Sequence, residues 1–318
     1  MKPKLVTFRR DPLRVRCFRR QTLALMAGLT LMAGTTSVLH AQLANIQKSV
    51  LLSWPEPAQE HIVVGSSSPG GPVWTPWPEP IFKRHGEICM AVPVTASNWF
   101  GKLVPGRQFV DAFSDARGPF TNRSPWMPHF NDPGEEWVVT NGVLQVGVHP
   151  SAIGGLLLAP VGTNVEVHLR DFYTSVDILD WETSGANWST FSIGARAYFQ
   201  TPTLARGYIG GLNLNANGVR GSVEPFIYNG STYTYALEST FDTQQFPLPY
   251  RLQLSGVGTK ISLRVLSLTT GQPIREVMLP NDWTFAEGWV ALWISGRHDA
   301  GDSFRIAADN FFATGTQP

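Results

Sequence analysis

The sequence has few cysteines, no helical periodicity and no clustered histidines. Only two of its 318 residues are cysteines, which excludes a disulfide-dense scaffold. Apolar residues never recur with a sustained helical period, and no repeat of solenoid or propeller length is present. The seven histidines lack the short spacing of a zinc motif. These absences exclude a helical bundle, a repeat protein and a sequence-evident zinc enzyme.

A large excess of charge of one sign is also missing. The chain has 25 Lys and Arg residues against 24 Asp and Glu residues, a formal net charge of +1. Eight basic residues and one acidic residue lie within the first 41 positions. Removing that segment would leave 17 basic residues (25 minus 8) and 23 acidic residues (24 minus 1), a net charge of −6. A chain of that sign is not expected to bind nucleic acid.

Residues 1–41 are expected to be a signal peptide for export. The basic segment is followed by an apolar stretch, residues 23–39, that is too short and too rich in Gly and Thr to span a membrane. Ala41 supplies the small residue of a cleavage site, and Arg19-Arg20 leaves the twin-arginine route open beside general secretion. We expect a secreted, periplasmic or cell-surface protein with no transmembrane anchor after cleavage; the alternative is a membrane-anchored N-terminus. Cys17 would leave with the signal, so Cys89 would stand alone as a buried small hydrophobic residue.

Asn-Gly pairs and strict alternation indicate antiparallel β-structure. The pairs are Asn141-Gly142, Asn217-Gly218 and Asn229-Gly230. Asn-Gly supplies the positive φ angles of a tight hairpin turn, and the alternation around it puts one strand face in a core and the other in water. The sequence therefore predicts a large all-β sandwich, a class that carries many unrelated functions.

Residues 47–107 are predicted to form a small β-sandwich-like module. Apolar runs at 50–54, 62–64 and 87–94 predict strands, with Pro- and Gly-rich turns between them. The order Leu-Ser-Trp-Pro, Gly-Pro-Val-Trp-Thr-Pro, Val-Pro-Val and Trp-Phe-Gly-Lys-Leu resembles fibronectin type III-like accessory modules of secreted bacterial proteins. About 60 residues is short for a complete sandwich of that type. Val104-Pro105-Gly106 is interpreted as the seam to the next domain.

Residues 108–316 are predicted to form a second domain, a two-sheet jelly roll. Strands are expected at 137–148, 164–179, 190–198, 207–214, 219–228, 250–254, 261–268, 288–294 and 304–313. The segments Phe109–Asp115, Trp137–Leu144 and Ala308–Phe311 resemble strands of concanavalin A-like, laminin G-like domains. The resemblance implies a concanavalin A-like jelly-roll sandwich whose first and last strands lie side by side.

The same resemblance implies a metal ion. In several concanavalin A-like domains a calcium ion bridges the first and last strands. Asp111 and Asp309 stand at comparable positions, and calcium prefers such oxygen ligands. The alternative is that both aspartates cap turns or face solvent.

Some members of this fold are glucanases with the pattern Glu-x-Asp-x-x-Glu on one strand. Here Ser175, Asp177 and Asp180 occupy that pattern, so the nucleophile position holds a serine without a neighbouring base. Without a bulge, period two would also put Asp180 on the opposite face from Asp177. Both points argue against this hydrolase. Trp137–Leu144 is also similar to the opening of secreted bacterial 3-keto-disaccharide hydrolases, which stay an alternative.

Tryptophans in polar surroundings are the candidate ligand-binding residues. Flat aromatic rings stack on the apolar faces of sugars, and nearby polar groups bond their hydroxyls. The candidates are Trp126, Asp180, Trp181, Asn187, Trp188 and Trp283. The alternative for each tryptophan is ordinary packing in the core.

The sequence favours a non-catalytic, exported protein that binds carbohydrate or mediates adhesion. Its expected partner is a glycan or a cell-surface polysaccharide. A hydrolase of the 3-keto-disaccharide kind and a purely structural cell-surface module are the alternatives.

Overall fold

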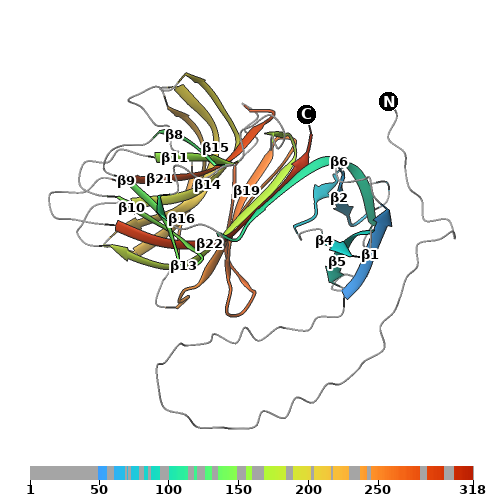
Figure 1. Cartoon of the computed structure of the whole chain (residues 1–318), viewed down its shortest axis with the longest axis horizontal. Helices are drawn as coiled ribbons and strands as arrows, with labels where there is room; N and C mark the ends of the chain where they lie inside the picture. The colour runs from blue at the N-terminus through green and yellow to red at the C-terminus, as the bar shows by residue number, and fades with distance from the viewer. Residues whose placement is uncertain are drawn as a thin grey trace, which may run out of the picture. The chain divides into compact units, whose positions relative to one another are not determined.

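The computed structural model is built from antiparallel β-sheets (Figure 1). It describes residues 49–55, 61–68, 70, 73–78, 82–84, 87–93, 100–113, 118–119, 126–130, 135–148, 155–159, 168–183, 189–201, 204–215, 218–228, 237–241, 245–279, 285–296 and 304–317. Among these residues no helix could cross a membrane. The predicted all-β, jelly-roll class is confirmed.

The chain divides into two compact units. One contains a three-stranded sheet in the order β1-β5-β4, formed by β1 (Ser49–Pro55), β5 (Glu87–Pro93) and β4 (Phe82–Arg84). The other holds the remaining described strands, including β2 (His61–Ser66) and β3 (Thr75–Pro76). The predicted strands at 50–54, 62–64 and 87–94 are therefore present, but they are shared between the two units.

The predicted seam at residues 104–106 lies inside β6 (Phe100–Asp111), which is one continuous strand. Residues 100–105 of β6 pair with β2, and residues 106–111 pair with the last strand of the chain. Gly106 lies where the partner changes. A Cβ there would come within 2.5 Å of the Gly315 carbonyl oxygen and 2.6 Å of Ile62 Cγ1. Glycine is therefore required at position 106 because the backbones approach closely there, and not because the residue belongs to a linker.

We call the larger sheet of the second unit sheet I. Its described strands run in the order β20-β19-β18-β13-β22-β10-β9-β7, and β6 pairs with β22 and β2 beside this path. The bounds are β7 (Gly118–Pro119), β9 (Glu135–Thr140), β10 (Val143–Val148), β13 (Phe172–Thr183), β18 (Tyr250–Val257), β19 (Lys260–Ser267), β20 (Pro273–Leu279) and β22 (Phe304–Thr316). The pairing of β6 with β22 confirms that the first and last strands of the jelly roll are neighbours.

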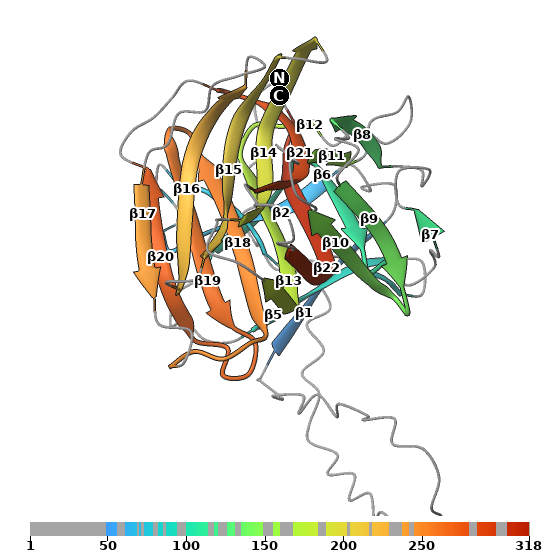
Figure 2. The ribbon, with the colours of Figure 1, turned by 90° about the vertical axis from the view of Figure 1, so that its left-hand side faces the viewer.

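We call the other sheet of this unit sheet II. Its described strands run in the order β17-β16-β15-β14-β21-β11-β8, with β12 paired to β21. The bounds are β8 (Met127–Phe130), β11 (Gly155–Ala159), β12 (His168–Leu169), β14 (Ser189–Thr201), β15 (Leu204–Asn215), β16 (Gly218–Tyr228), β17 (Leu237–Phe241) and β21 (Gly288–Gly296). Figure 2 shows β14, β15 and β16 as long curved strands with β18 and β19 of sheet I behind them.

The hydrophobic core fills the space between the two sheets. Leu254 and Leu263 of sheet I lie opposite Gly210 of sheet II, where a Cβ would come within 2.8 Å of a Leu254 methyl group. Alternate residues of each strand contribute to this core, such as Leu292 on β21. Alternation therefore assigns the other residues of each strand to the outer face of the sheet.

One predicted hairpin turn is seen directly. Asn141 and Gly142 connect β9 to β10 with φ angles of 54° and 77°, the left-handed conformations that a two-residue turn of this kind needs. Asn217, Asn229 and Gly230 lie outside the described residues. The strands β15 and β16 on either side of Asn217 pair antiparallel, as predicted.

Candidate functional site

The outer face of sheet II carries two tryptophans on one strand. In β21, Val290, Leu292 and Ile294 belong to the hydrophobic core. Trp289 and Trp293 alternate with them and therefore lie on the outer face. In keeping with this, Trp293 is buried but does not belong to the core between the sheets. We call the side chains on this face, including those described below, the outer row of sheet II.

Small residues surround Trp293 on the neighbouring strands. The strand register places Ser192 of β14 beside Trp293, and Gly211 of β15 beside Ser192. A Cβ on Gly211 would collide with the Ser192 side chain and with the Phe191 carbonyl oxygen, so only glycine fits there. One step along, Ala291 lies beside Gly194. This part of the outer row thus combines small residues with Ile209 and Trp293, and its side chains are buried.

Polar groups accompany these side chains. The Ser192 side chain is buried, with 1% of the residue exposed, and its Oγ has no hydrogen-bond partner within the described structure. Next to it the Thr190 hydroxyl donates to the Asn213 side-chain oxygen. A buried hydroxyl without a partner is uncommon in native proteins and points to a group that a ligand or water would satisfy. The outer row therefore combines aromatic and hydrogen-bonding groups.

Beside the outer row, at the end of sheet II that holds Trp289, partly exposed side chains from both faces of the sheet come together. Arg206 is two residues from the core residue Tyr208 and therefore lies on the core-facing side of β15. Tyr198 is 38% exposed, and its ring lies nearly parallel to that of Trp289, with centroids 6.0 Å apart and an interplanar angle of 11°. His168 of β12 packs edge-on against the Trp289 ring, and the centroids of these two rings are 5.4 Å apart. The Arg206 guanidinium lies over Tyr198, 5.0 Å from the ring centroid. We call these four residues the open end.

A β-bulge in β14 lies next to the open end. Gly194 pairs with Ala291 and Ala197 with Trp289, so two residues of β14 stand opposite Val290 alone. One of the two, Arg196, has a left-handed φ of 49°. Bulges shift the alternation of side chains and bend a strand. This one sends Arg196 into the protein just before the strand reaches Tyr198.

Arg196 joins several chain segments. Its residue is 1% exposed, and its guanidinium donates to three backbone carbonyl oxygens: those of Arg170 at 2.7 Å, Gly258 at 2.9 Å and Phe285 at 2.9 Å. It also lies over the rings of Phe172 and Tyr208, 5.4 and 5.9 Å from the centroids. Burial lowers the pKa of Arg196, while Tyr208 and Asp171 act in the opposite direction. Arg196 thus closes this end of the sandwich through buried hydrogen bonds.

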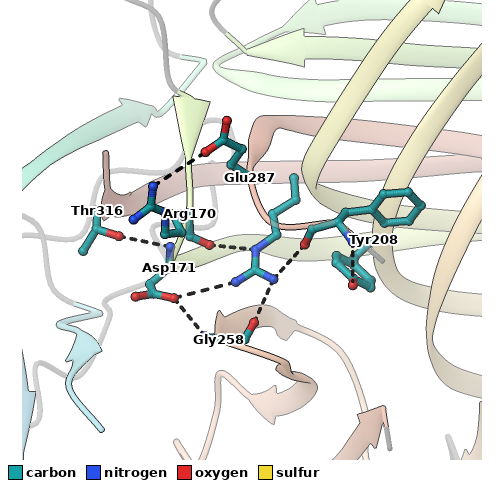
Figure 3. Close-up of polar contacts among 8 residues, drawn as sticks. Arg170, Asp171, Tyr208, Gly258, Glu287 and Thr316 are labelled. Carbon is teal, nitrogen blue, oxygen red and sulfur yellow. Dashed lines mark hydrogen bonds and ion pairs between the residues drawn. The ribbon is translucent and has the colours of Figure 1, made fainter. Parts of the chain in front are cut away.

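Asp171 and the end of the last strand complete this cluster, as Figure 3 shows. Asp171 Oδ1 lies 3.7 Å from Arg196 Nη2 and accepts a hydrogen bond from the Gly258 amide at 2.9 Å. The Asp171 amide donates to the Thr316 hydroxyl at 3.1 Å, which ties in the C-terminal strand. Arg170 and Glu287 form a longer, exposed ion pair at 3.9 Å. Because the cluster is satisfied internally, we assign it to structure rather than to binding.

The predicted ligand-binding residues do not come together in one place. Trp126 is 4% exposed; its ring packs against Phe109, Phe113 and Phe311, and its Nε1 donates to Asp111 at 2.7 Å. It is a core residue with no face free to stack on a sugar, because aromatic packing and a buried hydrogen bond occupy it. Asn187, Trp188 and Trp283 lie outside the described residues.

Asp180 and Trp181 lie on β13, in sheet I. Asp180 is exposed, and its carboxylate accepts a hydrogen bond from the Trp181 amide at 2.9 Å. The Trp181 ring is partly buried and packs on Tyr250, with centroids 5.6 Å apart. These two residues therefore belong to a different sheet from the outer row of sheet II.

The predicted calcium pair fits a shared ion poorly. Asp111 pairs with the core residue Phe311, and its two carboxylate oxygens accept hydrogen bonds from the Phe113 amide and from Trp126. Asp309 instead pairs with Asp177 and lies on the outer face of sheet I. No group of three or more His, Cys, Asp or Glu residues in the described ranges could hold a metal ion. Asp111 matches the alternative of a turn-capping role.

Burial raises the pKa of Asp309. The Asn310 amide, which donates to Asp309 Oδ1 at 2.7 Å, opposes this shift, while the charges of Asp177 and Asp111 add to it. Asn310 itself has a left-handed φ of 51° and donates from its side chain to Asp177 at 3.1 Å. Asp177 also forms a bidentate pair with Arg251, at 2.6 and 2.9 Å.

The expected separation of Asp177 and Asp180 on opposite faces is wrong. A register shift between Ile178 and Asp180 pairs Asp180 with Ala307 and Asp177 with Asp309, so both aspartates lie on the outer face of sheet I. The bulge resets the alternation that the sequence argument assumed. The other objection to a glucanase stands, because Ser175 occupies the nucleophile position and Arg251 neutralises Asp177.

Sequence reasoning missed the open end and both tryptophans of β21. One signal was available: in Gly-Trp-Val-Ala-Leu-Trp-Ile, residues 288–294, the two tryptophans alternate with Val and Leu and must share a face. Tyr198 and Arg206 carried no comparable signal, because the bulge that separates them from the regular register is not visible in the sequence.

No family model and no curated protein matches this chain. Among solved structures it is similar to the carbohydrate-binding module CBM66 from Bacillus subtilis, at 16% identity and a TM-score of 0.39 over 59% of this chain and 93% of that one. It is also similar to the CBM2 module of the evolved Dit of Lactobacillus casei BL23 phage J-1, at 13% identity and a TM-score of 0.44 over 66% and 97%. The exoplasmic/lumenal domain of VIP36 in its Ca2+/Man2-bound form gives 11% identity and a TM-score of 0.41 over 65% and 87%. Likenesses at this level say nothing about the ligand of this chain.

Proposed function

We propose that this chain is an exported, non-catalytic glycan-binding protein and that the outer row of sheet II is its binding surface. The observation that carries the proposal is the stacked pair of the partly exposed Trp289, on the non-core face of β21, and the exposed Tyr198. Large aromatic side chains that are not needed for the core between the sheets are suited to contact the apolar faces of sugars.

The neighbours of the β21 tryptophans support the same function. The Ser192 hydroxyl has no hydrogen-bond partner among the residues that the structure describes, and Thr190 and Asn213 form a hydrogen-bonded pair on the same face. Sugar recognition uses such hydroxyl and amide groups beside a flat apolar surface. The described side chains of the outer row contain no pair of carboxylates, the groups that glycoside hydrolysis normally employs. This composition favours binding over cleavage.

Export is proposed from the sequence. The basic segment, the apolar stretch and Ala41 at residues 1–41 have the order of a signal peptide. Cleavage after Ala41 in a bacterial expression host, detected by N-terminal sequencing of the secreted chain, would support it. Retention of the whole chain in the cell would contradict it.

A glycan array with the full chain tests the binding function. The best-binding glycan is then titrated against the Trp289→Ala and Tyr198→Ala variants by calorimetry. We expect each to lose about tenfold or more in affinity, because each removes aromatic contact area at the open end.

Trp74→Ala is the matched control. Trp74 is also a partly exposed tryptophan, packed against Lys102 at 4.1 Å, but it lies beside β3, outside sheet II. Its substitution should leave the affinity unchanged. The proposal fails if no glycan binds, or if Trp74→Ala weakens binding as much as Trp289→Ala does.

A further inference from the structure

Arg206 has an unusual environment for a partly buried arginine. Its guanidinium lies over two rings, 5.0 Å from the Tyr198 centroid and 5.9 Å from that of Phe285. Within the described part of the chain it has no carboxylate partner and donates no hydrogen bond. Four other arginines among the described residues, by contrast, each lie within 3.9 Å of a carboxylate: Arg170, Arg251, Arg264 and Arg305. Arg206 therefore keeps its donors available.

The nearby carboxylates are engaged elsewhere. Glu287 pairs with Arg170, and Asp171 faces Arg196. His168 packs edge-on against Trp289, the second ring of the Tyr198–Trp289 pair. The open end thus presents one cationic group, Arg206, beside an aromatic pair, and its described side chains include no acid.

Stacking prepares the Arg206 guanidinium for one kind of ligand. An arginine held over aromatic rings loses less further freedom on binding, and its guanidinium carries its N–H donors in one plane. Those N–H groups match the two oxygens of a carboxylate in a bidentate pair. The full chain carries a net charge of +1, and the chain without residues 1–41 would carry −6 (17 basic minus 23 acidic residues), so a polyanion would be attracted by this local site rather than by the overall charge.

We propose that the glycan bound at the open end is acidic, and that Arg206 binds the carboxylate of a uronic acid residue while the sugar contacts Tyr198 and Trp289. This inference rests on the proposed glycan-binding function and adds the class of ligand. It assigns Arg206 a role in specificity: Arg206 distinguishes acidic from neutral sugars.

The test compares an acidic oligosaccharide with its methyl ester, in which each carboxylate is neutralised by a methyl group. The full chain is titrated by calorimetry with hexagalacturonate and with its hexamethyl ester at low salt. We expect the acid to bind about 10- to 100-fold more tightly, the range of a charge-assisted bidentate contact, and the difference to shrink in high salt. Arg206→Gln should remove the preference, and Arg206→Lys should keep part of it, because a point charge cannot make the bidentate pair.

Arg264→Gln is the control, since Arg264 is an exposed arginine paired with Glu276 on β20. It should leave the preference intact. Equal binding of acid and ester, or a preference that survives Arg206→Gln, overturns the inference. If neutral glycans bind in a Trp289-dependent way without any preference for acid, only the ligand class is wrong. If no glycan of either charge binds, the glycan-binding function itself fails.

Discussion

Two of the described β-bulges hold a non-glycine residue in the left-handed conformation, and the side chains of these two residues have different roles. Arg196 in sheet II has a φ of 49° and Asn310 in sheet I a φ of 51°. The Arg196 side chain is buried and donates to three backbone carbonyls, whereas Asn310 is exposed and makes one side-chain bond, to Asp177. The same backbone device thus anchors an interior cluster in one place and arranges surface charges in the other.

The difference lies in what each bulge does for its neighbours. Saturated hydrogen bonding at Arg196 fixes the end of the sandwich and leaves the adjoining Tyr198 and Trp289 outside it. The bulge at Asn310 brings Asp309 close to Asp177, with Arg251 as the compensating charge. We therefore expect substitutions at the first bulge to cost far more stability than substitutions at the second.

The largest effect is expected for Arg196→Met. The substitution leaves the carbonyls of Arg170, Gly258 and Phe285 without their donor and removes the ion-pair partner of Asp171. The free energy of unfolding, measured by urea denaturation, should fall by about 3–5 kcal/mol. Arg264→Met, at an exposed ion pair, should cost roughly 0.5 kcal/mol or less.

A smaller loss is expected for Arg251→Met. Asp177 is buried, so removing Arg251 leaves a carboxylate whose one remaining side-chain donor among the described residues is Asn310. Because Arg251 is itself partly exposed, we expect a loss of about 1–2 kcal/mol. Adding Asp177→Asn should recover part of it. A loss as large as that of Arg196→Met would break the contrast between the two bulges.

Much of the sandwich could be predicted from the sequence because alternation reports burial directly. The strands around 250–254 and 261–268 match β18 and β19, whose buried and less buried residues alternate strictly. The edge strand β20 was missed, since only Val277 and Leu279 of its seven residues are buried and its pattern is mostly polar. The described edge strand β17 was missed as well.

The site was harder to predict than the fold. Alternation in β21 could have revealed Trp289 and Trp293, but polar surroundings drew attention to Trp126, which is buried in the core. Register shifts at Arg196 and at Asp180 reverse the side-chain pattern without a signature in the sequence. Nor could the sequence show that Arg206 lies over Tyr198, since that contact depends on the bulge.

Asn310 allows a test of the backbone alone. Glycine adopts a φ of 51° without strain, whereas alanine does not. Both Asn310→Gly and Asn310→Ala remove the bond to Asp177, so the difference between them isolates conformation. We expect Asn310→Ala to be about 1 kcal/mol less stable than Asn310→Gly in urea denaturation. Equal stabilities would mean that the bulge relaxes when the side chain is changed.

The smallest effect concerns the pH dependence of stability at Asp309. Burial raises the pKa of Asp309 above its ordinary value in the folded chain, so the folded state binds this proton more tightly than the unfolded state. The resulting stabilisation is present below the ordinary pKa of aspartate and is lost as pH rises through the raised value. Asn at position 309, in the Asp309→Asn variant, cannot ionise, so the variant does not lose this stabilisation as the pH rises. It should gain roughly 0.5 kcal/mol relative to the parent chain between about pH 4 and pH 7, measured by urea denaturation across that range.

The central claim is that glycans bind the outer row of sheet II rather than the aromatic groups of sheet I or the core. The most direct measurement is a titration of the full chain with the best-binding glycan, followed by the tryptophan indole N–H signals in two-dimensional NMR. The account predicts that the Trp289 signal shifts progressively while those of the core residues Trp126 and Trp137 stay in place. A shift confined to Trp181, or to any tryptophan outside sheet II, would contradict it.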